Sequence, residues 1–198
     1  MGDHTQPADF HFLQSNGCAP LAHGRRDGYA TSIPMTEPAR KARNEERLKE
    51  LYPTFAARLR RVIKDLETDG VRPRIQDAWR SPDDQLKAFT NGNSKLKFGF
   101  HNVTGTGGKK ESLAVDMLDD NAPLKPSTEY LLRLAAAARK HGLITGVLWG
   151  LPAPLQKGVK EAIAAKNFKA VVKVGWDPTH IEPTGITPAE AKAGKRPA

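Results

Sequence analysis

Cysteine is almost absent: Cys18 is the only one among the 198 residues of the chain. A lone cysteine can form no disulfide within the chain, and it cannot supply the cysteine cluster of a structural zinc site. Any metal ion that this protein binds must therefore be held mainly by histidine and carboxylate side chains.

Long apolar runs are also missing. No stretch approaches the roughly 18 consecutive apolar residues that predict a membrane-spanning helix. The opening residues, MGDHTQPADF, lack the basic start and apolar centre of a secretory signal peptide. We therefore expect no signal peptide, no transmembrane segment and synthesis in the cytoplasm, so that any action outside it needs another route of release or secretion.

Acidic residues are in deficit, with 22 of them against 31 basic residues and a formal net charge of +9. Such a charge attracts polyanions, among them nucleic acids, anionic membranes and anionic cell-wall polymers, and it does not choose between them. The apolar fraction of 38% is that of an ordinary globular protein. The length favours a single domain, and we expect a monomer.

Composition divides the chain into three parts. Residues 1–37 are rich in Gly, Pro and polar residues without a sustained period, which predicts an irregular N-terminal arm. Residues 38–186 contain the periodic segments and form the predicted domain. Residues 187–198 offer almost nothing to bury, so we expect a flexible basic tail.

Hydrophobic periodicity within the domain predicts both helices and strands. Apolar residues spaced three or four apart predict one long amphipathic helix from Glu37 to Leu66, whose basic face we interpret as its solvated side. Ser127 and Gly142 are typical helix boundaries. Strands are predicted at 74–79, 113–118, 144–149 and 169–174. A short helix is predicted to begin just after Ser81, and further helices are predicted at 127–141 and 156–166.

Two of the six histidines stand near other groups that metal chemistry uses. Asp116 lies on the predicted strand that follows His101, and Asp177 precedes His180 by three residues. Two neutral imidazoles and one carboxylate are a common catalytic zinc set, with a fourth position left for water. The other histidines, His4, His11, His23 and His141, are interpreted as surface or core residues.

The acids around His180 offer two candidates for a proton-transferring carboxylate. Pro178 excludes a regular helix and favours a turn that enters a strand, so that Asp177 and His180 face one cavity. Glu182 lies two residues beyond His180, and on a strand it would point to the same face. We rank Asp177 as the base and Glu182 as the supporting partner of a ligand.

Four patches occur in an order and rough spacing that is known from one family: residues 79–85 (WRSPDDQ), His101 with residues 112–117 (SLAVDM), residues 147–150 (VLWG) and residues 177–182 (DPTHIE). In these patches the chain resembles the M15 family of zinc peptidases. That family includes peptidoglycan D-alanyl-D-alanine carboxypeptidases and phage L-alanyl-D-glutamate endopeptidases. The resemblance covers residues 79 to 182.

The resemblance implies a compact α+β fold in which a small antiparallel sheet carries the zinc site and helices cover one side. One Zn²⁺ ion would be held by His101, Asp116 and His180. Asp177 would activate the attacking water, and Arg80 would bind and polarise the scissile carbonyl. The implied reaction is hydrolysis of peptide bonds in peptidoglycan.

The remaining positions of the motifs receive supporting roles by the same resemblance. Gln85 and Trp149 would contact the substrate together with Arg80. Ser81 would contact the residues of the site and not the substrate. Two insertions depart from the family pattern, one near residues 103–111 that lengthens the spacing from His101 to Asp116, and one at residues 151–173. Because loop closure costs only about 0.6 kcal/mol per doubling of loop length, the ligand pair can survive the first insertion.

Several functions stay open on the sequence alone. The favoured one is an L-Ala-D-Glu endopeptidase of the endolysin type, released by a phage or secreted into a rival cell. A D-Ala-D-Ala carboxypeptidase of the same family is the alternative within the class. Two alternatives lie outside the class of enzymes: a non-catalytic module that binds zinc or the cell wall, and a basic nucleic-acid-binding module. The second has no recognisable nucleic-acid-binding motif in its favour, and we expect no specific nucleic acid as a partner.

Overall fold

The computed structural model describes residues 33–92 and 94–198, so Cys18 and three of the histidines discussed above, His4, His11 and His23, lie outside the described residues. Within them the chain forms one four-stranded antiparallel sheet with the order β1-β2-β4-β3 and six α-helices. The predicted α+β architecture with a small antiparallel sheet is confirmed. The strands are β1 (Pro73–Asp77), β2 (Val115–Asp119), β3 (Leu143–Thr145) and β4 (His180–Pro183).

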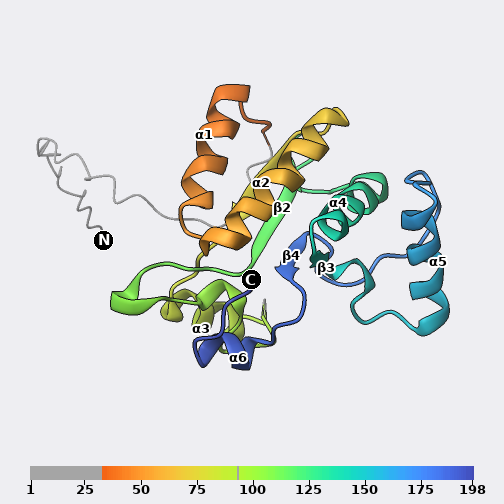
Figure 1. Cartoon of the computed structure of the whole chain (residues 1–198). Helices are drawn as coiled ribbons and strands as arrows, with labels where there is room; N and C mark the ends of the chain where they lie inside the picture. The colour runs from red at the N-terminus through yellow and green to blue at the C-terminus, as the bar shows by residue number, and fades with distance from the viewer. Residues whose placement is uncertain (1–32, 93) are drawn as a thin grey trace, which may run out of the picture.

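Three of the helices, α1, α2 and α4, contact the strands of this sheet. Figure 1 shows α1 and α2 above it and α3 and α6 below it, while α5 packs on the outside of α4. No helix among the described residues is long and apolar enough to cross a bilayer. The helices are α1 (Glu37–Leu48), α2 (Pro53–Thr68), α3 (Pro82–Thr90), α4 (Thr128–Lys140), α5 (Ala153–Ala164) and α6 (Pro188–Lys192).

The prediction of a single helix from Glu37 to Leu66 was wrong, because the chain breaks between α1 and α2. Pro53 has no backbone N–H to donate, and it restricts the residue before it to extended conformations. Tyr52 accordingly has φ −62° and ψ 137°. The apolar positions of the segment are buried as predicted: Leu48, Leu51, Phe55, Leu59, Val62, Ile63 and Leu66.

Strand register places two of the predicted site residues directly opposite each other. Asp116 on β2 pairs with His180 on β4, next to the pair Val115 and Ile181. Because successive side chains of a strand point to opposite faces, Val115 and Ile181 enter the core while Asp116 and His180 share the other face. The fold itself thus brings together two residues that are far apart in sequence.

The predicted strand at 144–149 is shorter than expected, since β3 ends at Thr145 and a 3-10 helix (Gly146–Leu148) follows. The predicted strand at 169–174 is wrong: the segment pairs with no strand in the described part of the chain. Val172 and Val174 pack against the core while Lys173 is exposed, so the alternation that suggested a strand reflects one-sided packing alone.

The segment 187–198, expected to be a flexible tail, contains α6 and is held by polar contacts. Thr187 caps α6 and forms a capping box with Glu190. Arg196 pairs with Glu111 at 3.1 Å and donates to the carbonyl of Thr104 at 2.9 Å. These contacts attach the segment to the insertion at residues 103–111.

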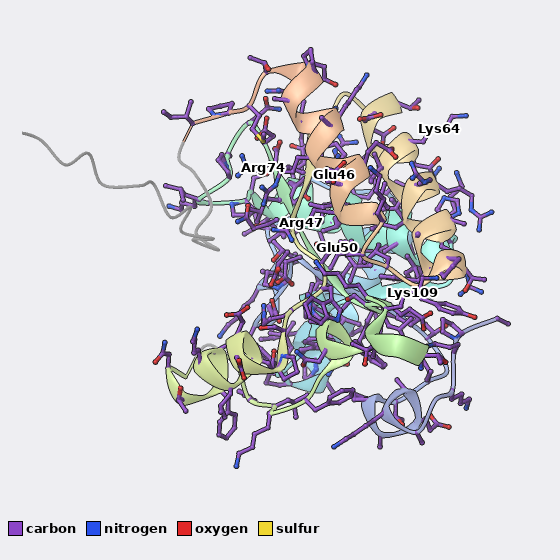
Figure 2. The ribbon with its side chains drawn as sticks, turned by 90° about the vertical axis from the view of Figure 1, so that its left-hand side faces the viewer. Glu46, Arg47, Glu50, Lys64, Arg74 and Lys109 are labelled. Atoms are coloured by element: carbon purple, nitrogen blue, oxygen red, sulfur yellow. The ribbon has the colours of Figure 1, made fainter. Side chains whose placement is uncertain are left out.

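The insertion is also attached to the loop between α1 and α2. Lys110 Nζ lies 2.8 Å from Glu50 Oε1, and the other oxygen of Glu50 accepts from Arg47 at 3.0 Å. Figure 2 shows Arg47 and Glu50 close together near the end of α1. Glu50 also accepts from the backbone N–H of Trp79 at 3.3 Å, so one carboxylate connects three segments around the site.

Candidate metal centre

Three predicted ligands meet on the face of the sheet that the core does not occupy. His101 belongs to the 3-10 helix Phe100–Asn102, Asp116 to β2 and His180 to β4. His101 Nε2 lies 3.4 Å from His180 Nδ1, and Asp116 Oδ1 lies 3.3 Å from His180 Nδ1 and 3.7 Å from His101 Nε2. Donor atoms about 2.0–2.1 Å from a tetrahedral zinc ion are roughly 3.3–3.4 Å apart, so the three atoms fit one face of such a site.

The second nitrogen of each imidazole is engaged by the protein. His101 Nδ1 lies 2.6 Å from the carbonyl oxygen of Ala78, and His180 Nε2 lies 3.1 Å from Glu182 Oε2. Both partners accept hydrogen bonds, so each ring carries its proton on the outer nitrogen when it is neutral. The lone pairs of His101 Nε2 and His180 Nδ1 are then directed at a common point, as metal ligation requires.

The electrostatics of this cluster favour the charged forms of Asp116 and His180. Burial by itself raises the pKa of Asp116, but the charges and hydrogen bonds of His101 and His180 lower that pKa well below its usual value. Burial lowers the pKa of His180, yet hydrogen bonds to Asp116 and Glu182 outweigh it and raise the pKa to about 10. A metal cation held by His101, Asp116 and His180 would bind the neutral forms of the two imidazoles and the unprotonated form of the carboxylate.

Asp177 stands beside the cluster in a constrained backbone. Its φ is +57°, in the left-handed region that non-glycine residues seldom occupy, and its Oδ2 lies 3.9 Å from His180 Nδ1. Burial and the nearby charge of Asp116 raise its pKa. Gly146 permits this arrangement, because a Cβ there would lie 2.1 Å from the carbonyl oxygen of Asp177.

Arg80 is the cation nearest to the three ligands. Its Nη2 lies 2.6 Å from Asp77 Oδ2 and 3.9 Å from Asp116 Oδ2, so Asp77 holds the guanidinium against the site. Its backbone N–H donates to the carbonyl of His101, and its own carbonyl accepts from Asn102 Nδ2, both at 2.9 Å. The segment that carries Arg80 and the segment that carries His101 are thus fixed to each other.

The other predicted residues have different surroundings. Gln85 is buried and accepts from Arg80 at 2.9 Å while its amide donates to Ser94 and Leu96, so it links Arg80 to the loop after α3. Ser81 caps α3 by accepting from the backbone N–H of Asp84. The ring of Trp149 lies 5.2 Å from that of His180.

A cavity of about 540 Å³ opens over the cluster. The three candidate ligands line it together with Asp177 and Arg80, and Gln85, Trp149 and Glu182 also border it. Of the residues predicted to act at the site, Ser81 alone is not part of its lining. The three candidate metal ligands, the Asp177 carboxylate and the Arg80 guanidinium therefore line one solvent-accessible cavity, whose size admits a short peptide.

Sequence reasoning did not find several residues that build this site. Lys95 and Trp176 line the cavity. Ser112 is fully buried, and its hydroxyl donates to the carbonyl of Ala114 at 2.7 Å. Asn102 and the carbonyl of Ala78 hold Arg80 and His101, and the adjacency of Asn102 to His101 was the one available signal.

Fold and site together define an α+β protein with a candidate metal centre. No known sequence family and no curated protein matches the chain. Solved structures that it resembles include the Serratia marcescens L-Ala D-Glu endopeptidase ChiX (TM-score 0.47, 20% identity, 72% of this chain and 87% of that chain). Others are the LD-carboxypeptidase LdcB (0.39, 19%, 73% and 72%) and the vancomycin resistance D,D-pentapeptidase VanY in complex with Zn(II) (0.36, 16%, 70% and 74%). At these scores the likenesses assign no activity to this chain.

Proposed function

We propose that this protein is a zinc-dependent peptidase that hydrolyses peptide bonds in bacterial peptidoglycan, with the L-Ala-D-Glu bond as the favoured target. The observation that carries the proposal is the spacing of the three donor atoms of His101, Asp116 and His180, beside a cavity that also contains Asp177 and Arg80. The donor set of two imidazoles and one carboxylate suits a single zinc ion with an open position.

The residues of the chain divide the chemistry between them. When bound, zinc would supply the Lewis acid that polarises the scissile carbonyl and acidifies the attacking water. Asp177 takes the proton of that water and passes it to the leaving amine. Arg80 stabilises the negative charge that develops on the carbonyl oxygen, an interaction worth roughly 3 kcal/mol per donor. Asp77 keeps the guanidinium in place for this task.

Substitutions of Asp177 and His180 test the assignment. We expect Asp177→Ala to retain stoichiometric zinc and to lose most turnover, and His180→Ala to lose both zinc and turnover. Asp83→Ala, an exposed acid on α3 that does not line the cavity, is the matched control and should behave as the wild type. Full activity of Asp177→Ala would remove it as the base.

The bond that is cut can be identified from the products. Purified muropeptides are incubated with the zinc-loaded protein and the products are analysed by mass spectrometry. Release of a fragment with a new amino terminus at D-Glu supports the endopeptidase, whereas release of single D-Ala residues supports the carboxypeptidase alternative. Intact muropeptides after incubation with the zinc-loaded protein would contradict the proposed activity.

A further inference from the structure

The Lys95 side chain is a cation in the cavity, and it has no role in the proposed catalytic chemistry. It follows α3 and lines the same cavity as the metal cluster, with its Nζ 4.5 Å from the centre of the Trp176 ring. Among the described residues no carboxylate lies within ion-pair distance of Lys95. Arg80, the other lysine or arginine of the cavity lining, is already paired with Asp77.

The cavity also carries negative groups. Asp116, Asp177 and Glu182 all line it, and they would repel an anionic part of a substrate unless a cation faced that part. Trp176 is 46% exposed and provides an apolar surface beside the ammonium group. A cation above an aromatic ring at a cavity edge keeps its N–H donors available to an anion.

The rings of Trp149 and Trp176 lie between Lys95 and the candidate metal ligand His180. The Trp149 ring lies 5.2 Å from the His180 ring and 5.5 Å from the Trp176 ring, on which Lys95 rests. An extended peptide advances about 3.3–3.6 Å per residue. A substrate that runs along these rings would therefore reach Lys95 within about four residues of the bond at the metal.

The position of Lys95 is fixed by the residues on either side of it. The buried amide of Gln85 donates to Ser94 Oγ at 2.8 Å and to the carbonyl of Leu96, while its oxygen accepts from Arg80. The same side chain thus fixes Lys95 relative to the guanidinium at the reacting carbonyl. Such support is typical of a residue whose placement matters for binding.

We propose that Lys95, together with Trp176, forms a subsite that binds a free carboxylate of the substrate peptide within about four residues of the scissile bond. The inference rests on the proposed peptidase function and adds the class of substrate: a peptide with an anionic group near the cleaved bond. A glutamate linked through its side-chain carboxyl, as D-iso-Glu is, retains such a carboxylate, and amidation removes it.

Two peptides that differ only in this group test the subsite. Both contain the L-Ala-D-iso-Glu bond, one with the free carboxylate and one with the carboxamide, and kcat/KM is measured for each. We expect the wild type to favour the carboxylate roughly tenfold or more, as a charge-assisted hydrogen bond allows. Lys95→Met should abolish the preference by raising KM for the carboxylate peptide, and Lys95→Arg should retain it.

Lys97→Met is the matched control, because Lys97 lies on the same loop, rests on the Phe89 ring at 5.4 Å and does not line the cavity. It should keep the wild-type preference. If Lys95→Met lowers kcat/KM equally for both peptides, or if the wild type shows no preference, the subsite is refuted while the peptidase assignment stands.

Binding measurements separate this subsite from the proposed function. Both peptides are titrated into the Asp177→Ala protein and into Asp177→Ala with Lys95→Met, with tryptophan fluorescence and calorimetry as readouts. Tighter binding of the carboxylate peptide that disappears without Lys95 supports the subsite even if no cleavage is ever found. Equal affinity of both peptides for both proteins refutes it, whatever the activity.

Discussion

Replacement of Glu182 by glutamine or alanine should weaken zinc binding without removing catalysis at saturating zinc. Glu182 Oε2 accepts from His180 Nε2 at 3.1 Å, and its side chain is only 18% exposed. A carboxylate in this position fixes the tautomer and the orientation of the ligand ring, and its loss costs about 10–100-fold in metal affinity. That range corresponds to about 1.4–2.7 kcal/mol. Glutamine can still accept through its carbonyl oxygen, so we expect it near the lower value and alanine near the upper one.

The assay is competition between the protein and a chromogenic zinc chelator, followed by turnover at saturating zinc. Glu129→Gln is the control, because Glu129 pairs with Arg133 on α4 at 2.8 Å and lies far from the cavity lining. Unchanged zinc affinity in Glu182→Ala would refute the reasoning. Normal affinity combined with lost turnover would instead make Glu182, and not Asp177, the proton-transferring group.

Three other predictions concern stability and backbone fit. Asp120→Ala should lower the free energy of unfolding in urea by about 3–5 kcal/mol, because this fully buried carboxylate pairs with two arginines. Gly146→Ala should reduce kcat about 100-fold, because its Cβ displaces the carbonyl of Asp177. The hydrogen bond from Arg40 lowers the pKa of Glu37 from 4.5 to about 2, so its stabilisation is complete above pH 4.5 and is lost toward pH 2. Glu37→Gln should flatten that part of the stability curve measured by urea unfolding.

Capping residues were sufficient to predict the ends of a helix whose boundaries depend on its own sequence. Ser127 and Gly142 marked α4, and the structure has Ser127 as the N-cap and Gly142 at φ +70° just after the helix. The break at Pro53 was available in the sequence too, but the apolar period continues across it and concealed the two helices. Periodicity reports which side of a segment is buried, and it does not report whether the chain is interrupted.

Contacts between segments far apart in the sequence could not be predicted from such local signals. Residues 169–174 alternate as a strand does, yet they pair with no strand among the described residues, since strand formation needs a partner that the segment itself cannot specify. The tail was expected to be loose because it has little to bury, whereas Arg196 fixes it through polar contacts with Glu111 and Thr104. Such contacts depend on the fold and leave no pattern in a single sequence.

The predicted ligands meet because short motifs specify residue types, and the fold supplies their geometry. The cross-strand pair of Asp116 and His180 follows from the register of β2 and β4. The position of Lys95 could not be anticipated, since it depends on how the loop after α3 folds back and hydrogen-bonds to Gln85. The sequence motifs therefore identified the candidate metal ligands, whereas the tertiary structure was needed to identify the other residues that line the cavity.

The insertion between His101 and Asp116 leaves the ligands undisturbed because it is closed at its base. Glu111 donates through its backbone N–H to the carbonyl of Val103 at 3.1 Å, and Leu113 donates to that of Phe100 at 3.0 Å. Residues between these contacts can be added at about 0.6 kcal/mol per doubling of loop length. The inserted residues do not line the cavity, and the donor atoms of His101, Asp116 and His180 lie within reach of one metal ion.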